Sequence, residues 1–185
     1  YGKTSTKEFL TTIFSKKFNV LTTKEHRNSE MGVSQTILEE LNKDHQIFIV
    51  EMGAYKKGGI SLLCDIVKPM IGVVTGVNEQ HLATFGSMEN ILSAEGGGEL
   101  LEKLPKNGLL IVNGDNKYCV DLYKKAHIHK RIYSEKGKGV ESDIWAEEVS
   151  VNKDSLDFIA MNKKKEAEHF DVAVMGRQHI QNLLG

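Results

Sequence analysis

The sequence has few cysteines, no long apolar run and almost no net charge, and each shortage excludes a class of protein. Its 185 residues contain two cysteines, Cys64 and Cys119, at a spacing that suits no metal site. Both stand among apolar neighbours, so we expect reduced, partly buried core residues of a cytosolic protein. No stretch approaches the roughly 20 apolar residues that a bilayer-spanning helix needs.

The charges nearly cancel, because 24 Lys and Arg residues face 25 Asp and Glu residues. Such a balance creates no field directed at nucleic acid or at an anionic membrane. The short basic run 163–165 is typical of a solvated turn. The sequence also lacks repeats and low-complexity segments, and its length suits one sizeable core. We therefore expect a single α/β domain that binds neither nucleic acid nor membrane.

Helix and strand patterns alternate through the first two thirds of the sequence. Continuous apolar runs at 46–52 and 71–75 are typical of strands buried on both faces. Amphipathic periodicity predicts helices around these runs. The predicted helices are 3–17, 29–42, 59–67, 87–104 (interrupted by three glycines at 96–98) and 116–126, and the remaining strands of this part are 20–22, 109–112 and 131–133.

The pattern then changes to strands with a period of two. Residues 145–151 and 156–160 alternate in polarity about a turn signal at 152–154, which predicts an antiparallel hairpin. Residues 170–174 continue in strand period, and a last helix begins at 178. The fold class predicted is therefore α/β, with a mostly parallel sheet, helices on both of its faces and a small antiparallel extension near the C-terminal end.

Residues 1–7 read YGKTSTK, and a Gly-Lys-Thr at the start of a helix is a phosphate-binding device. The small Gly2 lets backbone N–H groups, including that of Ser5, approach an anion; the Lys3 ammonium reaches the outer phosphates, and the Thr4 hydroxyl ligates Mg²⁺. The motif lacks its opening glycine, so we expect the chain to be the interior of a larger nucleotide-using protein. The alternative is an ordinary helix start, with Thr4 or Thr6 near its N-cap.

Two more polar residues follow predicted strands, where ligands of open α/β sheets bind. Glu51 ends the first apolar run, and His81 lies in the loop after the second. A carboxylate supplies the hard oxygen ligand that Mg²⁺ requires. With Lys3 and Thr4 they predict a Mg²⁺–nucleotide site. Taken singly, Glu51 is also suited to capping the next helix, and His81 to an ordinary loop position.

Six segments, in this order and spacing, resemble the central ATPase domain of the Mur ligases of peptidoglycan synthesis. They are YGKTSTK, HRNSEMGVS, EMGA, HLATFGS, NGDN and GRQHIQN. The resemblance covers the whole chain, 1–185, and EMGA and HLATFGS are similar to the D-alanyl-D-alanine-adding branch of the family. It implies a P-loop-type ATP-binding domain between an N-terminal domain that holds the UDP-sugar and a C-terminal domain that closes over ATP.

The resemblance also implies the reaction and its partners. A substrate carboxylate attacks ATP to give an acyl phosphate, and an amine then displaces phosphate to form an amide. The small-molecule substrates are a UDP-N-acetylmuramoyl-tripeptide and D-alanyl-D-alanine, and we expect a cytoplasmic monomer. Alternatives are another Mur or folylpolyglutamate synthetase-like ligase, or a catalytically dead nucleotide-binding relative.

The motif matches imply a role for each candidate residue. Lys3 contacts the β- and γ-phosphates and Thr4 the first Mg²⁺, while Glu51 and His81 help to hold a second Mg²⁺. Asn28 lies near the phosphates and metal, and Asn182 contacts adenine.

The family usually carries a lysine that CO₂ carbamylates, and the carbamate binds the second Mg²⁺. This sequence departs from the family at that position. Residues 93–99 read SAEGGGE and offer no lysine. Glu95 presents a carboxylate without modification, and the adjacent glycines let the backbone shift to make up its shorter reach. We therefore expect Glu95 to be a metal ligand and, with Lys3 and His81, a catalytic residue. The alternative is a solvated Glu95 and a lost second metal site.

Overall fold

The computed structural model describes residues 2–24, 27–54, 56–77, 87–94, 97–137 and 141–185. Helices and strands alternate along the first part of the chain, as predicted. The elements are α1 (Lys3–Phe14), β1 (Val20–Thr22), α2 (Glu30–Glu40), β2 (Ile47–Ile49), α3 (Gly59–Val67), β3 (Ile71–Val74), α5 (Met88–Ser93), α6 (Gly98–Lys103), β4 (Leu109–Asn113), α7 (Lys117–Lys125), β5 (His129–Ser134), β6 (Ile144–Val151), β7 (Leu156–Asn162), β8 (Ala167–Val172) and α8 (His179–Leu184).

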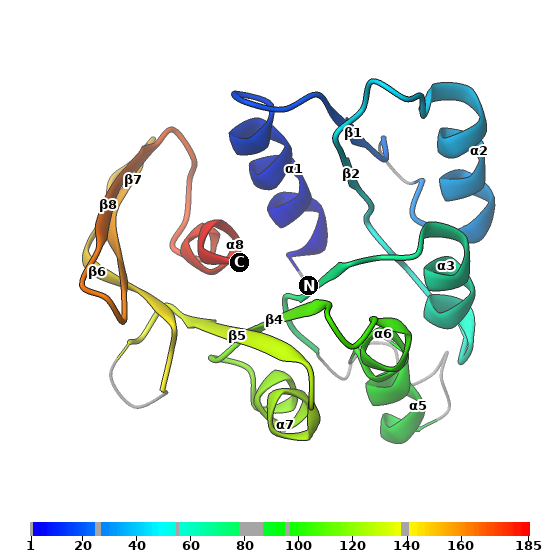
Figure 1. Cartoon of the computed structure of the whole chain (residues 1–185). Helices are drawn as coiled ribbons and strands as arrows, with labels where there is room; N and C mark the ends of the chain where they lie inside the picture. Colours follow the sequence, from blue (N-terminus) through cyan, green and yellow to red (C-terminus); the bar gives the residue numbers. More distant parts are fainter. Residues whose placement is uncertain (1, 25–26, 55, 78–86, 95–96, 138–140) are drawn as a thin grey trace.

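The strands form two sheets in this structure. β1 and β2 pair in parallel, and a separate sheet has the order β3-β4-β5-β6-β7-β8. In the larger sheet β3 to β6 are parallel, whereas β7 and β8 are antiparallel to their neighbours. Figure 1 shows α1 and α8 on one side of β4 and β5 and α5, α6 and α7 on the other. The predicted fold class is confirmed, with the antiparallel extension where the sequence placed it.

Two apolar clusters hold these layers together. The first lies between the parallel strands and α3, α5, α6 and α7, and its fully buried members include Leu63, Ile91 and Leu110. The second lies under α8 and contains Phe158 and Ile180. Burying each such side chain contributes about 1.5–3 kcal/mol. The second cluster anchors α8 to the antiparallel strands and so fixes the position of the C-terminal residues.

Local sequence explains where several helices begin. The Ser29 hydroxyl accepts a hydrogen bond from Gly32 N at the start of α2, and the Asn116 side chain accepts from Tyr118 N and Cys119 N at the start of α7. These side chains satisfy backbone donors that have no partner within the helix. The predicted helix 87–104 is interrupted as expected, since α5 ends at Ser93 and α6 begins at Gly98, after Gly97 with a φ of 84°.

The apolar faces of α1, α2 and β2 are less buried than the sequence predicted. The run of β2 was expected to be covered on both faces, but all three of its residues are only half-buried. The first helix ends at Phe14 rather than at residue 17, and its buried residues are the polar Thr6 and Lys7. Leu38 of α2 is 85% exposed. For α1 and β2 the reason is a cavity that they line, described below.

The alternation predicted for β6 is also wrong in detail. Ala146 is buried, whereas Trp145 is half-exposed and Val151 is exposed. The β6–β7 register shifts between Glu147 and Ser150, and Glu148 has a φ of 50°. A bulge adds a residue to one strand and so moves later side chains to the other face.

Both cysteines are free and fully buried, Cys64 in α3 and Cys119 in α7. Burial raises the pKa of the Cys64 thiol to about 11 and that of Cys119 to about 12. Their thiols are therefore protonated at neutral pH. Within the described ranges, no helix has the length and apolar character needed to cross a membrane.

Candidate functional site

The start of α1 has no capping side chain. Gly2 adopts the left-handed conformation with a φ of 72°, and no side chain caps the helix. The alternative of Thr4 or Thr6 as a capping residue is therefore wrong. The start of a helix is the positive end of its dipole, and its first-turn N–H groups suit an anion.

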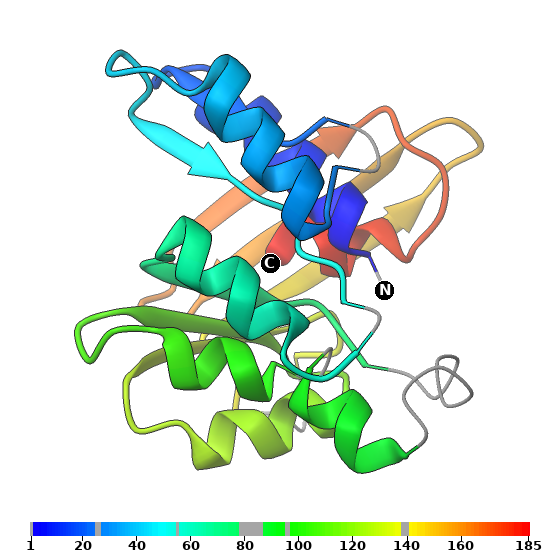
Figure 2. The ribbon, with the colours of Figure 1, turned by 90° about the vertical axis from the view of Figure 1, so that its right-hand side faces the viewer.

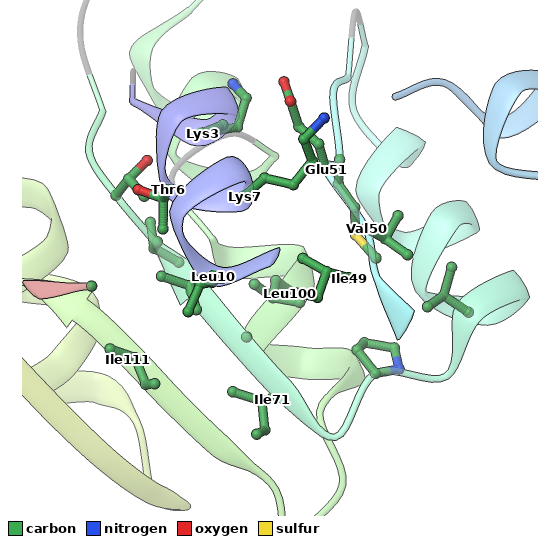
Figure 3. Close-up of a pocket in the computed structure, with 18 of the residues that line it drawn as sticks. Lys3, Thr6, Lys7, Leu10, Ile49, Val50, Glu51, Ile71, Leu100 and Ile111 are labelled. Carbon is green, nitrogen blue, oxygen red and sulfur yellow. The ribbon is translucent and has the colours of Figure 1, made fainter. Parts of the chain in front are cut away.

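Thr4 and Glu51 meet at this helix start, although 47 residues separate them in sequence. The Thr4 hydroxyl donates a hydrogen bond to Glu51 Oε1 over 3.1 Å. Glu51 N in turn donates to the Thr23 hydroxyl, which holds the end of the β2 segment against β1. In Figure 3 the Lys3 and Glu51 side chains lie at the same end of a pocket. The structure thus brings together three of the predicted site residues, Lys3, Thr4 and Glu51.

Lys7 is a structural residue that the sequence reasoning missed. Its side chain is 4% exposed, and its ammonium donates to Thr23 O over 2.8 Å and pairs with the Glu8 carboxylate at 2.9 Å. Lys7 lies one turn after Lys3, on the same face of α1. Its ammonium ties α1 to the end of β1, beneath the predicted phosphate site.

Asn28 lies against the loop that follows Glu51. Its carbonyl accepts a hydrogen bond from Gly53 N over 2.9 Å. A Cβ at Gly53 would stand 3.1 Å from the Asn28 amide, so the glycine of EMGA permits this close approach. The structure therefore places Asn28 on the Glu51 side of the helix start.

Asn182 of α8, near the C-terminal end of the sequence, lies beside Gly2 at the start of α1. A Cβ at Gly2 would overlap with the Asn182 side-chain oxygen. Its neighbour Gln181 accepts a hydrogen bond from the Asn113 amide over 3.1 Å, and that amide also donates to Thr75 O. Asn113 thus joins the residue after β3 to α8, whose Asn182 lies beside Gly2.

The NGDN segment, to which the sequence assigned no role, organises the carboxyl ends of the strands. Besides the contacts of Asn113, the Asp115 carboxylate accepts hydrogen bonds from the Ser134 hydroxyl and from Glu135 N, both at 2.7 Å. The Asn116 amide donates to Val77 O. The segment therefore fixes the ends of β3, β4 and β5 relative to one another.

His81 and Glu95 lie outside the described residues. The other carboxylate of the SAEGGGE segment, Glu99, is 4% exposed and accepts hydrogen bonds from Gly58 N over 2.6 Å and Ser61 N over 2.9 Å. Glu99 thus caps α3, a task that the sequence offered to Glu51 as an alternative. Within the residues that the structure describes, no group of three His, Cys, Asp or Glu side chains is placed to hold a metal ion.

A cavity of about 600 Å³ runs from Lys3 and Glu51 between β2 and β3 (Figure 3). We call it the β2–β3 cavity. Residues 46–52 line one side and residues 70–76 the other. Further lining residues come from α1, α3, α6 and β4, and include Thr6, Leu10, Phe14, Ile60, Leu100 and Ile111.

Comparison with known proteins places this geometry in a family. The model of the family described as "Mur ligase middle domain" matches residues 1–185. A UDP-N-acetylmuramoyl-tripeptide–D-alanyl-D-alanine ligase of Synechocystis is 36% identical over 156 residues, which cover 84% of this chain and 34% of that protein.

Solved structures agree with the sequence match. A crystal structure of MurF from Acinetobacter baumannii has a TM-score of 0.86 at 27% identity, over 98% of this chain and 38% of that one. The structure of MurF ligase from Thermotoga maritima in complex with ADP has a TM-score of 0.82 at 25% identity, over 99% of this chain and 41% of that one. The chain thus spans about two fifths or less of the length of these relatives. Because the family model matches every residue, the chain belongs to the Mur ligase family and corresponds to its middle domain.

Proposed function

We propose that this chain is the ATP-binding domain of an ADP-forming ligase that adds D-alanyl-D-alanine to a UDP-N-acetylmuramoyl-tripeptide. The observation that carries the proposal is the meeting of Lys3, Thr4 and Glu51 at the uncapped start of α1. The relatives indicate the substrates, since they are UDP-N-acetylmuramoyl-tripeptide–D-alanyl-D-alanine ligases. The acceptor and the amine would be bound largely by flanking N-terminal and C-terminal domains.

The residues at this site fit a Mg²⁺–nucleotide complex. The Thr4 hydroxyl and the Glu51 carboxylate are oxygen donors 3.1 Å apart, and Mg²⁺ prefers such ligands. The N–H groups of the first turn of α1 and the Lys3 ammonium suit the phosphates. Bound there, Mg²⁺ would neutralise charge on the phosphates. Thr4 would hold a first Mg²⁺, and Glu51, to which the Thr4 hydroxyl donates a hydrogen bond, would help to hold a second one beside it.

The chain's own residues would act mainly by positioning and by charge. A substrate carboxylate and the γ-phosphate repel each other, and the transferring phosphoryl group carries negative charge on its three outer oxygens. Lys3 directs a positive charge at that group, where preorganised charge lowers the barrier most. Asn182, beside Gly2, would contact the nucleotide, and Asn28 would support the Glu51 loop. His81 and Glu95 complete the proposed set as ligands of a second Mg²⁺.

The test uses the intact protein and measures ADP formation with all substrates and with each omitted. We expect ADP to form at a substantial rate only when the UDP-linked tripeptide and D-alanyl-D-alanine are both present, with the amide product in equal amount. Replacement of D-alanyl-D-alanine by D-glutamate or by diaminopimelate should abolish turnover. ATP binding without any turnover would favour the catalytically dead relative, and turnover with a different amine would reassign the substrate.

A further inference from the structure

The carboxyl end of β5 carries a carboxylate to which the proposed reaction gives no role. Glu135 directly follows β5, and its side chain is only 10% exposed. Its backbone N–H donates to the Asp115 carboxylate over 2.7 Å, so the loop after β4 fixes the place of Glu135. Ligands of open α/β sheets bind at this end of the strands, which makes a largely buried carboxylate here a candidate for a part in the site.

The Glu135 carboxylate binds two side chains from the segment that contains α8. One of its oxygens accepts a charge-assisted hydrogen bond from Arg177 Nε, and the other accepts from Gln181 Nε2 over 3.3 Å. Arg177 lies two residues before α8, and Gln181 lies within the helix. Hydrogen bonds between ionised partners are the stronger kind, so Glu135 holds the start of α8 at two points.

Gln181 is also held from its other side. Its Oε1 accepts a hydrogen bond from Asn113 Nδ2, at the end of β4, over 3.1 Å. The same Asn113 amide donates to Thr75 O over 2.9 Å. Because the Gln181 amide is bound at both its oxygen and its nitrogen, its direction is fixed. The direction of one side chain sets the rotation of the whole helix about its axis.

Apolar packing alone would not set that rotation. Ile180 and Leu184 of α8 are buried in the second apolar cluster and lie four residues apart, on one face of the helix. Burial of this face resists lifting α8 off the antiparallel strands, but hydrophobic contacts are not directional. The hydrogen bonds of Glu135 therefore supply the direction that the apolar contacts lack.

The residue after Gln181 is the one that lies at the start of α1. The Asn182 side-chain oxygen occupies the space that a Cβ at Gly2 would need, and Figures 1 and 2 show α8 beside α1. Adjacent residues of a helix project about 100° apart, so the direction of Gln181 determines that of Asn182. Loosening α8 would move Asn182, whereas Lys3 is carried by α1 and would stay in place.

We propose that Glu135 and Arg177 are positioning residues of the nucleotide site, which hold α8 so that Asn182 meets the base of the nucleotide. The inference rests on the proposed function, in which Asn182 contacts the nucleotide. The Glu135–Arg177 pair acts through Asn182 and does not itself touch the nucleotide. Its loss lowers the fraction of molecules in which α8 is correctly placed, and the apparent affinity falls by that fraction.

A purely structural role for the pair would have a different signature. If the pair only stabilised the fold, its loss would lower the midpoint of urea unfolding and weaken all ligands alike. Two ligands separate these cases: ADP carries a base and phosphates, and inorganic tripolyphosphate carries phosphates alone. The start of α1 binds the phosphates of both, so only ADP should respond to the placement of α8.

The experiment uses the intact protein and compares Arg177→Met with the parent. Arg177 is 60% exposed, so the variant should fold with an unchanged urea midpoint. By calorimetry with Mg²⁺ present, we expect the affinity for ADP to fall about tenfold and that for tripolyphosphate to stay within about twofold. In an assay of ADP release, the KM for ATP should rise by the same factor, while kcat changes by less than about twofold.

Three further variants control this result. Lys103→Met breaks an ion pair of the same kind, between Lys103 of α6 and Asp65 of α3 at 2.7 Å, and should leave both affinities unchanged. Glu135→Gln keeps the size of the side chain, removes its charge and should reproduce the loss of ADP affinity. Arg177→Lys keeps the charge and should recover part of that affinity.

A double-mutant cycle with Asn182→Ala tests whether the pair acts through Asn182. If it does, adding Arg177→Met to Asn182→Ala should lower ADP affinity by less than about twofold more, since the contact is already lost. Full additivity would overturn the proposal, as would unchanged ADP affinity in Arg177→Met or an equal loss of affinity for tripolyphosphate. A parent protein that binds neither ATP nor ADP would instead refute the proposed function, and the role of the pair with it.

Discussion

At the scale of single residues, Lys3 is the side chain on which the proposed chemistry depends most. Replacing Lys3 with Ala in the intact protein removes the charge aimed at the transferring phosphoryl group, and we expect turnover to fall by about 10²–10³-fold. Lys16 is an exposed lysine beyond the far end of α1, so Lys16→Ala is the matched control. A steady-state assay of ADP release measures this effect. A Lys3→Ala turnover rate within a few fold of the parent rate would refute the phosphate-loop assignment.

Glu95 gives the second prediction at this scale. If its carboxylate takes the place of a carbamylated lysine, no carbamate has to form, and activity should be the same in bicarbonate-free and bicarbonate-supplemented buffer. Glu95→Gln keeps the size and removes the charge, so it should raise the Mg²⁺ concentration needed for half-maximal rate with little loss of stability. Equal Mg²⁺ dependence of the two proteins would show that Glu95 is not a ligand.

At the scale of elements, the start of α3 depends on a carboxylate from α6. Glu99→Gln leaves one of the two N–H groups at Gly58 and Ser61 facing an amide NH₂ or an unsatisfied position. A buried donor without its acceptor costs about 1–3 kcal/mol, and the charge also favours the positive end of the helix. We expect a loss of that size in urea unfolding. The exposed Glu102 of α6 provides the control, and Glu102→Gln should change stability by less than about 0.5 kcal/mol.

The two buried cysteines, Cys64 in α3 and Cys119 in α7, should make the stability of the protein depend on alkaline pH. Burial raises the thiol pKa to about 11 in Cys64 and about 12 in Cys119, while an unfolded thiol titrates near its ordinary value of about 8.5. Between about pH 9 and 11 the unfolded state therefore loses protons that the folded state keeps. Stability is present below this window and falls through it, by up to about 1.4 kcal/mol per pH unit for each thiol.

A variant with both cysteines replaced by alanine tests this prediction. It should be less stable at pH 7, because two buried side chains are shortened, but its stability should fall less steeply from pH 9 to 11. Lysine and tyrosine ionisation acts on both proteins and cancels in the difference between their slopes. Parallel stability–pH curves would mean that the thiols do not contribute.

At the scale of the whole molecule, nucleotide binding should require more than the 185 residues. The chain brings Thr4 to Glu51 and Asn182 to Gly2, but in the proposed ligase a flanking domain closes over ATP and adds contacts that these 185 residues do not supply. We expect calorimetry to show at least tenfold weaker ATP binding by the chain than by the intact protein. Low-micromolar binding by the chain alone, about −8 kcal/mol, would contradict the expectation.

The candidate site was predictable from sequence only in part, and individual residues show why. Lys3, Thr4 and Glu51 were found because each stands beside a strong local pattern, a helix start or the end of an apolar run. Lys7 and Glu99 were missed, since a buried charge has no local signature and its partners are distant in sequence. His81 and Glu95 stay predictions.

The sequence by itself determined the order and type of the elements, because apolar periodicity, capping residues and glycines act over a few neighbouring residues. It also determined the family, because each motif consists of a few consecutive residues and can be recognised without the tertiary structure. Tertiary structure alone decided which apolar faces are covered: α1 and β2 carry the right pattern but border a cavity, and β6 buries Ala146 and breaks its register beyond Glu147. Burial depends on what packs against a face, and the partners of a face are distant in sequence, so the local pattern does not specify them.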